Sequence, residues 1–211
     1  HGFVYSNGEF TTIDGPGAVA TFAHSINASG QVTGSYRDSS SYLLHGFVYD
    51  NGMFTTFDVP GATDTSARSI NASGQVAGYY QDSSGQHGFI YGNGTFTTID
   101  VPGATKDTRA YGINDSSQVT GVYVDPSYHG FVYSNGEFTT IDGPGAITTG
   151  ALSINASGQV TGSYLNSSGS YGFVYSNGTL MTLTPPGTNY TQAFSINDSG
   201  QVAGSYEDSS G

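Results

Sequence analysis

The sequence predicts an all-β protein made of five copies of one four-stranded unit. The fourteen residues "HGFVYSNGEFTTID" at His1 recur unchanged from His129, and close variants begin at His45, His87 and Tyr171. The 211 residues include 32 glycines, and short runs rich in Val, Ile, Thr, Tyr and Phe alternate with turn-forming residues, which is typical of strands and hairpins. A fixed repeat length dictates the architecture. We interpret the chain as one domain with copies 1–44, 45–86, 87–128, 129–170 and 171–211.

Each copy opens with a predicted hairpin. Asn-Gly favours a type I′ turn, because both of its central residues need positive φ. Taking Asn7-Gly8 as this turn pairs Tyr5 with Phe10 and brings His1 opposite Asp14. The same register predicts three further histidine–aspartate pairs: His45 with Asp58, His87 with Asp100, and His129 with Asp142.

The second hairpin of each copy reads "SINASGQV" or a close variant. A three-residue loop places Gly30 in the left-handed conformation that a type I turn plus bulge needs. Only the third copy differs, with Ser117 at this position. The longest link, "VPGATDTS" in the second copy, joins the two hairpins.

These units predict a five-bladed β-propeller with four antiparallel strands per blade. Apolar residues on both faces of the first hairpin indicate sheets covered on both sides, since a half-solvated sheet would show one polar face. The long link should run from the outermost strand of one blade, "FTTID", to the innermost strand of the next, "A-x-S-I-N". The chain then begins with outer strands and ends with inner ones, so we expect these two pieces to pair and close the ring. A β-solenoid is the alternative.

Composition excludes several kinds of partner. The net charge is −12 with only four Lys and Arg, which argues against nucleic acid and anionic membranes. No apolar run reaches 18 residues, so we expect no membrane insertion. The chain has no cysteine, which excludes disulfides and thiol chemistry. We expect an extracellular monomer without a cofactor.

One face of the predicted disc is the better candidate for function. Length differences between copies fall in the "DSSG" and "PGAT" links, and function concentrates where loops vary. The x of "A-x-S-I-N" also differs in every copy, and Lys106 and Arg109 are unique to the third link. We interpret these positions as candidate ligand-binding residues: His24, Arg68, Tyr111, Lys106 and Arg109. Simple tolerance of substitution beside a loop is the alternative for the x position.

Two other patterns favour structural roles. A histidine–aspartate pair could serve as a general base, but four copies carry it and no nucleophile accompanies it. We therefore interpret the pairs as cross-strand hydrogen bonds, worth about 0.2–1 kcal/mol each. The Asp-rich links "RDSSS", "QDSSG", "VDPS" and "EDSSG" could bind Ca²⁺, but they lack alternating aspartates, so Asx-turn capping is the preferred interpretation. No metal site is predicted.

The motifs "YGINDSSQVTG" and "HGFVYSNG" resemble the bacterial extracellular HAF-type repeats, in which a segment like "GINDSGQVVG" precedes "HAFLW-NG". This chain has Gly for the central Ala of "HAF" and Tyr for Trp. The resemblance implies secretion or surface display and a propeller-like fold, and it implies no activity or catalytic residues.

Three functions remain open at this stage. The first is an extracellular binding module for glycans or a surface polymer. The second is a structural or adhesive scaffold without a small-molecule ligand. The third, a glycan-acting hydrolase, is disfavoured because the inner strands offer Ala, Ser, Ile and Asn rather than paired carboxylates. We therefore expect a protein that is not an enzyme.

Overall fold

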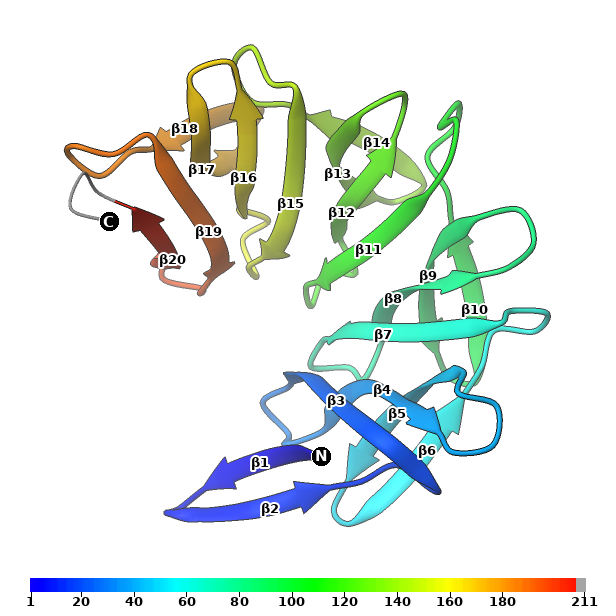
Figure 1. Ribbon diagram of the computed structural model, residues 1–211. Coiled ribbons are helices and arrows are strands. Elements are labelled where there is room, and N and C mark those ends of the chain that lie inside the picture. The colour runs from blue at the N-terminus through cyan, green and yellow to red at the C-terminus, as the bar shows by residue number, and fades with distance from the viewer. Residues whose placement is uncertain (208–211) are drawn as a thin grey trace. The chain divides into compact units, whose positions relative to one another are not determined.

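The computed structural model describes residues 1–207 and is all-β (Figure 1). The chain divides into two compact units, residues 1–99 and 100–211. The first unit contains β1 (Gly2–Ser6), β2 (Glu9–Ile13), β3 (Ala18–Ile26), β4 (Val32–Asp38), β5 (Leu44–Asp50), β6 (Met53–Phe57), β7 (Asp64–Ile70), β8 (Val76–Gln81), β9 (Gln86–Gly92) and β10 (Thr95–Ile99). The second contains β11 (Thr108–Ile113), β12 (Val119–Val124), β13 (Tyr128–Ser134), β14 (Glu137–Ile141), β15 (Thr148–Ile154), β16 (Val160–Asn166), β17 (Gly169–Ser176), β18 (Thr179–Leu183), β19 (Tyr190–Ile196) and β20 (Val202–Glu207).

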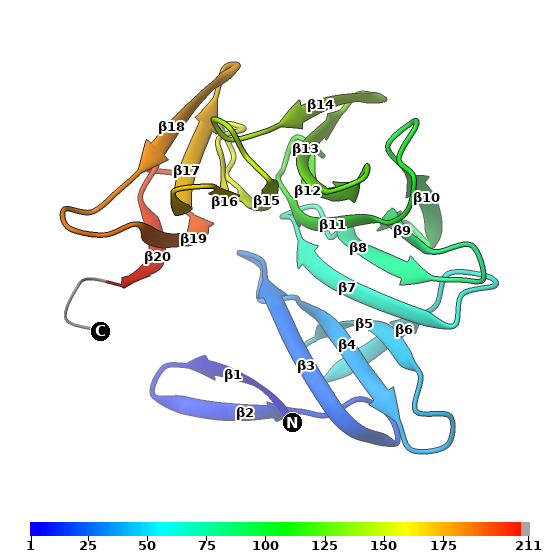
Figure 2. The ribbon, with the colours of Figure 1, turned by 45° about the horizontal axis from the view of Figure 1, so that its top comes forward.

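Four complete four-stranded antiparallel meanders occur among the described residues: β3–β6, β7–β10, β11–β14 and β15–β18 (Figure 2). Each combines the last two strands of one sequence copy with the first two of the next. The "A-x-S-I-N" strand therefore lies at one edge and "FTTID" at the other, which confirms the predicted strand order. Two half-sheets remain. The β1–β2 hairpin pairs with no other strand in its unit, and β19–β20 joins β17 through a single parallel bridge between Ser170 and Tyr190.

Turn chemistry sets the register of the hairpins as predicted. Asn7 and Gly8 have φ values of 52° and 88°, and Tyr5 pairs with Phe10. Gly30 is left-handed with φ 83°, and Ser117 adopts φ 58° at the same position of the third copy. Positive φ is strained for a residue with a Cβ atom, so Ser117 carries a cost that glycine avoids.

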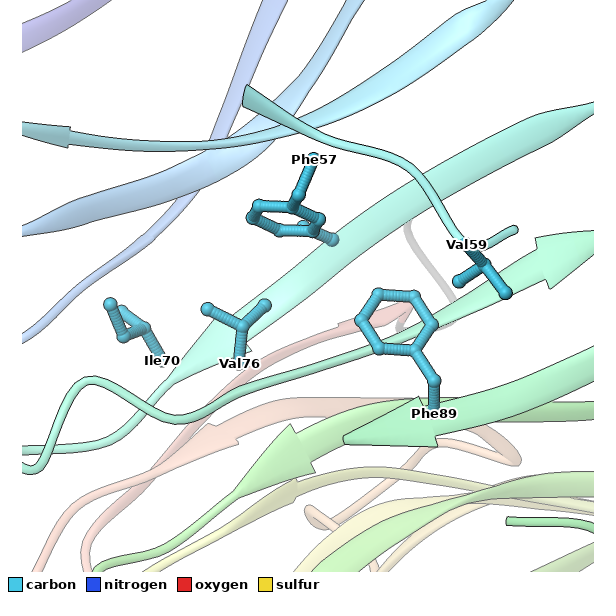
Figure 3. Packing of buried hydrophobic residues seen from close by; sticks show 6 residues of the cluster. Phe57, Val59, Ile70, Val76 and Phe89 are labelled. Carbon is cyan, nitrogen blue, oxygen red and sulfur yellow. The ribbon is translucent and has the colours of Figure 1, made fainter. Parts of the chain in front are cut away.

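One phenylalanine of the "HGF" motif fills the centre of every complete sheet. Phe47, Phe89, Phe131 and Phe173 are all fully buried. Phe89 packs with Phe57, Val59, Ile70 and Val76 in a core of the first unit (Figure 3). Burial of such a ring contributes about 1.5–3 kcal/mol.

The half-sheets lack this burial. Phe3, the equivalent residue of the first copy, is 61% exposed, and Tyr5 and Phe10 beside it are also exposed. Five of the six residues of β20 are exposed, whereas the first three residues of β4, β8, β12 and β16 are buried. Both half-sheets therefore expose apolar side chains or backbone groups whose equivalents in the complete sheets are buried.

Candidate functional site

The variable position of "A-x-S-I-N" is the extra residue of a β-bulge in all five copies. Pairing passes from Ala23 directly to Ser25, which leaves His24 outside the ladder. The same register shift leaves out Arg68, Tyr111, Leu152 and Phe194. A bulged residue lies outside the regular pairing of the backbone ladder, so no opposite side chain in the partner strand restricts which residue type can occupy it. The sequence marks this position as divergent but does not reveal the bulge.

The structure brings His24 and Arg68 together in the first unit. Nδ1–H of His24 donates to the carbonyl oxygen of Ala67 at 2.8 Å, and Nη1 of Arg68 lies 3.3 Å from Nε2 of His24. Since the guanidinium can only donate, Nε2 accepts and the imidazole is neutral. Desolvation and the Arg68 charge lower the pKa of His24, against the opposing hydrogen bond to Ala67.

The other three candidates belong to the second unit. Arg109 forms an ion pair with Asp107 at 3.2 Å, hydrogen-bonds Tyr111, and lies 6.0 Å from the centre of the Tyr128 ring. The Lys106 side chain is exposed in the preceding link. Tyr128 was not selected from the sequence; its position directly before the "HGF" motif of the fourth copy was the available signal.

Three of the predicted histidine–aspartate pairs lie within single units, and the structure forms each of them. Nδ1 of the histidine lies 2.8–3.0 Å from the aspartate in His1–Asp14, His45–Asp58 and His129–Asp142. The fourth predicted pair, His87 with Asp100, spans the boundary between the units and stays a prediction. Within its own unit, His87 contacts Ser84 and Asp82 at 2.8 Å and 3.3 Å.

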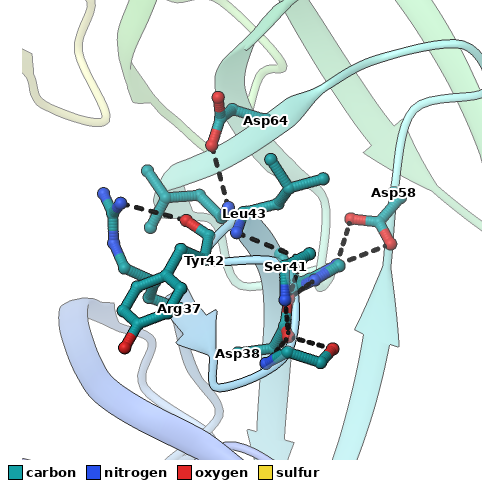
Figure 4. A network of polar contacts seen from close by, with 10 residues as sticks. Arg37, Asp38, Ser41, Tyr42, Leu43, Asp58 and Asp64 are labelled. Carbon is teal, nitrogen blue, oxygen red and sulfur yellow. Dashed lines mark hydrogen bonds and ion pairs between the residues drawn. The ribbon is translucent and has the colours of Figure 1, made fainter.

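His45 has a carboxylate facing each of its ring nitrogens. Nε2 lies 3.0 Å from Asp38, opposite the contact of Nδ1 with Asp58 (Figure 4). Both nitrogens must donate, so the imidazolium form is favoured. Partial burial lowers the pKa of His45, but the hydrogen bonds and charges of the two aspartates outweigh it, and the net shift is upward.

The Asp-rich links use their carboxylates to cap their own turns. Asp38 accepts hydrogen bonds from the backbone N–H groups of Ser40 and Ser41 at 2.6 Å and 2.8 Å, and Asp82 accepts from Ser84 at 2.7 Å. Hydrogen bonds from the hydroxyls of Ser40 and Ser41, together with those from the Ser41 N–H and His45, lower the pKa of Asp38 well below its usual range. The Asx-turn prediction is confirmed for these two links. The fourth link, "EDSSG", lies mostly outside the described residues.

The asparagines that end the "A-x-S-I-N" strands have a second role that the sequence did not reveal. Oδ1 of Asn27 accepts from the Gln31 N–H at 3.0 Å within the turn, while its Nδ2 donates to the Asn71 carbonyl of the next copy at 3.0 Å. Asn114 and Asn155 repeat the inter-copy bond in the second unit. Each such side chain therefore joins consecutive sheets, which is a structural role.

A cavity of about 260 Å³ opens in the first unit between the sheets β3–β6 and β7–β10. Tyr42, Leu43 and Leu44 line it from the longest "DSS" link, with Arg37 beside them and Asp64 opposite. The remaining lining residues are Ser66, Tyr79, Gln81 and Gln86. The two extra residues of the first copy were the sequence signal for this cavity, but which side chains would face it could not be read from the pattern.

Within residues 1–207, no three His, Asp or Glu side chains are arranged to hold a metal ion. The same part of the chain contains no helix with the length and apolar character needed to cross a membrane.

Comparison with known proteins finds similarity of fold only. No family model matches the chain, and no curated protein matches its sequence. Among solved structures, the β-propeller domain of the Trilobed protease from Pyrococcus furiosus is 8% identical with a TM-score of 0.47, over 96% of this chain and 80% of that one. YCF48 from Cyanidioschyzon merolae is 9% identical with the same TM-score, over 90% and 73%.

Proposed function

We propose that this protein is an extracellular binding module whose ligand is a glycan or a sugar-bearing surface polymer. The observation that carries the proposal is that each unit gathers an arginine, a carboxylate and a tyrosine at links that differ between otherwise similar copies. In the first unit Arg37, Asp64 and Tyr42 line one cavity. In the second, Arg109 contacts Asp107 and Tyr128.

This combination suits a polyhydroxylated ligand. A guanidinium only donates hydrogen bonds, a carboxylate only accepts them, and a sugar hydroxyl does both. The electron-rich face of a tyrosine ring attracts the weakly positive C–H groups on one face of a pyranose. The Ser84 and Ser127 hydroxyls lie 2.8 Å and 3.4 Å from Nε2 of His87 and His129, so binding is proposed on the arginine, carboxylate and tyrosine contacts alone.

We also propose that the chain forms a five-bladed propeller whose fifth blade is built from both half-sheets. In the complete sheets, the second strand pairs with the third in one register, for example Ala77 with Ile90 and Gly78 with Phe89. The same register applied to the half-sheets would pair Ala203 with Val4 and Gly204 with Phe3. It would cover the exposed ring of Phe3 and the unpaired edges of β1 and β20, which supports the closed arrangement.

A glycan array tests the binding function. The purified protein is applied with Ca²⁺ and again with EDTA, with heat-denatured protein as the control for non-specific adhesion. We expect binding to one sugar class under both conditions. Loss of binding in EDTA alone would assign Ca²⁺ to the Asp-rich links, whereas absence of binding under both conditions would contradict the proposal and favour the scaffold.

A further inference from the structure

We propose that the cavity of the first unit is a single binding site for one neutral sugar ring, with Tyr42 as the stacking platform and Arg37 and Asp64 as hydrogen-bonding groups. This inference rests on the proposed glycan-binding function and assigns it to one place. A volume of about 260 Å³ is smaller than the roughly 300–1,000 Å³ of sites for drug-sized ligands. It therefore suits one monosaccharide unit, such as the end of a chain.

Tyr42 adopts a left-handed backbone conformation in the link between β4 and β5. Its φ is 61°, and among the described residues the other non-glycine positions with positive φ are asparagines and Ser117, all in tight hairpin turns. Bulky residues rarely adopt this conformation, and such strain concentrates at binding and catalytic sites. Tyr42 is nevertheless 60% exposed, so packing in the core does not offset the strain.

Specific contacts hold the link that carries Tyr42. Nη1 of Arg37 donates to the carbonyl oxygen of Tyr42 at 3.0 Å, and the N–H of Leu44 donates to Oδ1 of Asp64 at 2.8 Å (Figure 4). Asp38 caps the start of the same link and binds His45 just after it. The tyrosine is thereby presented on a fixed loop, which lowers the entropy cost of binding.

The charges around the cavity favour a neutral ligand over an ion. Arg37 retains guanidinium N–H groups beyond the one bound to Tyr42, and in the described part of the chain Oδ2 of Asp64 has no hydrogen-bond partner. Asp64 would repel a phosphate or carboxylate, and Arg37 would repel an ammonium group. A sugar with adjacent hydroxyls satisfies both, because each hydroxyl donates and accepts.

The links of the second and third copies differ from the one that carries Tyr42. The second copy replaces the link with "DSSGQ", which ends in Gly85 and Gln86, and the third replaces it with "DPSY". If each blade carried an equivalent sugar site, binding would be multivalent and only partly lost on mutation of one link. A site that depends on Tyr42 predicts one ligand in the first unit, separate from any ligand held by Arg109, Asp107 and Tyr128 in the second.

The test is saturation-transfer NMR of the whole protein with the methyl glycosides of glucose, galactose, mannose and N-acetylglucosamine. Tyr42→Gly removes the ring and relieves the positive φ, while keeping the carbonyl oxygen that Arg37 binds. Asp64→Ala removes one hydrogen-bonding group. Met53→Ala, which alters a residue 71% exposed at an Asn-Gly turn, is the matched control.

We expect at least one glycoside to bind the wild type at one site in the first unit, and its affinity for that site to fall at least tenfold in Tyr42→Gly and Asp64→Ala but not in Met53→Ala. Thermal denaturation of Tyr42→Gly should show an unchanged or raised Tm, which excludes unfolding as the cause. Unaltered binding in Tyr42→Gly, or loss only in Tyr128→Ala, would overturn this site while leaving the glycan function in place. A positive array with no binding of the four glycosides would likewise overturn the single-ring site alone.

Discussion

His24 and His45 lie in opposite electrostatic surroundings within one unit. The Ala67 carbonyl fixes the tautomer of His24 and leaves Nε2 facing the Arg68 guanidinium, so a proton there would meet a positive charge. His45 lies between Asp38 and Asp58, so a second proton is stabilised. His24 is therefore a neutral hydrogen-bond acceptor, whereas His45 is favoured as a cation that binds two aspartates.

These surroundings predict separate titrations. Against the ordinary histidine pKa of 6.5, the midpoint of His24 should be lower and that of His45 higher. Since folding raises the pKa of His45, its stabilising contribution is complete below pH 6.5 and is lost as pH rises through the folded pKa. The depressed pKa of His24 has the opposite sign: its contribution is present above pH 6.5 and is lost as pH falls through the folded pKa. NMR titration of the imidazole C–H signals measures both, and coincident midpoints would contradict the described contacts.

Within residues 1–207, the buried hydroxyl of Thr191 lacks a hydrogen-bond partner because a proline replaces the residue whose N–H would donate to it. In the other copies a buried threonine accepts from the backbone N–H that follows the outer strand, as Thr149 does from Gly143 at 3.2 Å. The equivalent residue of the fifth copy is Pro185, which has no N–H, and the buried hydroxyl of Thr191 has no partner among the described residues.

Replacing that hydroxyl should therefore stabilise the protein. We expect Thr191→Val to raise the free energy of unfolding by about 1–3 kcal/mol, because it removes an unsatisfied buried polar group. Thr149→Val, which leaves the Gly143 N–H without its acceptor, should instead destabilise by a similar amount. Chemical denaturation measures both, and equal effects of the two substitutions would contradict this explanation.

At the scale of the strand, each β-bulge depends on a glycine in the neighbouring strand. A Cβ atom on Gly162 would lie 1.9 Å from the Gly150 carbonyl oxygen, which the bulge pushes toward it. A Cβ atom on Gly34 or Gly204 would likewise lie 2.0 Å from the carbonyl oxygen of Phe22 or Gln192. The small residue thus permits the bulge that carries the divergent side chain.

Substitution of that glycine should disrupt the strand pair. We expect Gly162→Ala to lower the free energy of unfolding by about 3 kcal/mol, at the upper end of the cost of overpacking. Gly150→Ala is the matched control, since its nearest contacts would be at 3.9 Å, and it should change stability by less than about 0.5 kcal/mol. Denaturant titration compares the two, and equal losses would show that the close approach is not the cause.

The sequence predicted some of these elements and not others for physical reasons. Asn-Gly turns act locally, so the register of the β1–β2 hairpin followed from Asn7-Gly8 alone. The bulge at His24 depends on how its strand pairs with the opposite strand, and no turn residue in the sequence predicts it. The cavity depends on which side chains of consecutive copies face each other, so Tyr42 and Asp64 could not be paired from their positions in the chain. The exposed ring of Phe3 was likewise unexpected, since the hairpin pattern is identical in buried copies.

At the scale of the molecule, five copies yield four complete sheets and two halves. A closed ring uses every copy and leaves no open edge, whereas an open chain of sheets exposes two edges capable of pairing with other molecules. The high net charge of −12 opposes such association between copies of the chain. Closure is therefore proposed because it uses all five copies without leaving an edge, and the charge disfavours covering such an edge with a second chain.

Closure of the ring through β20 and β1 is the claim on which this architecture depends, and a pair of cysteines tests it most directly. The chain has no native cysteine, so Val4→Cys with Ala203→Cys introduces a single possible disulfide. Ala77→Cys with Ile90→Cys, at the equivalent positions of a complete sheet, is the matched control. Under mild oxidation we expect both double variants to form an intramolecular disulfide to the same extent. Failure of the Val4–Ala203 pair alone, or its conversion to a disulfide-linked dimer, would contradict closure within one chain.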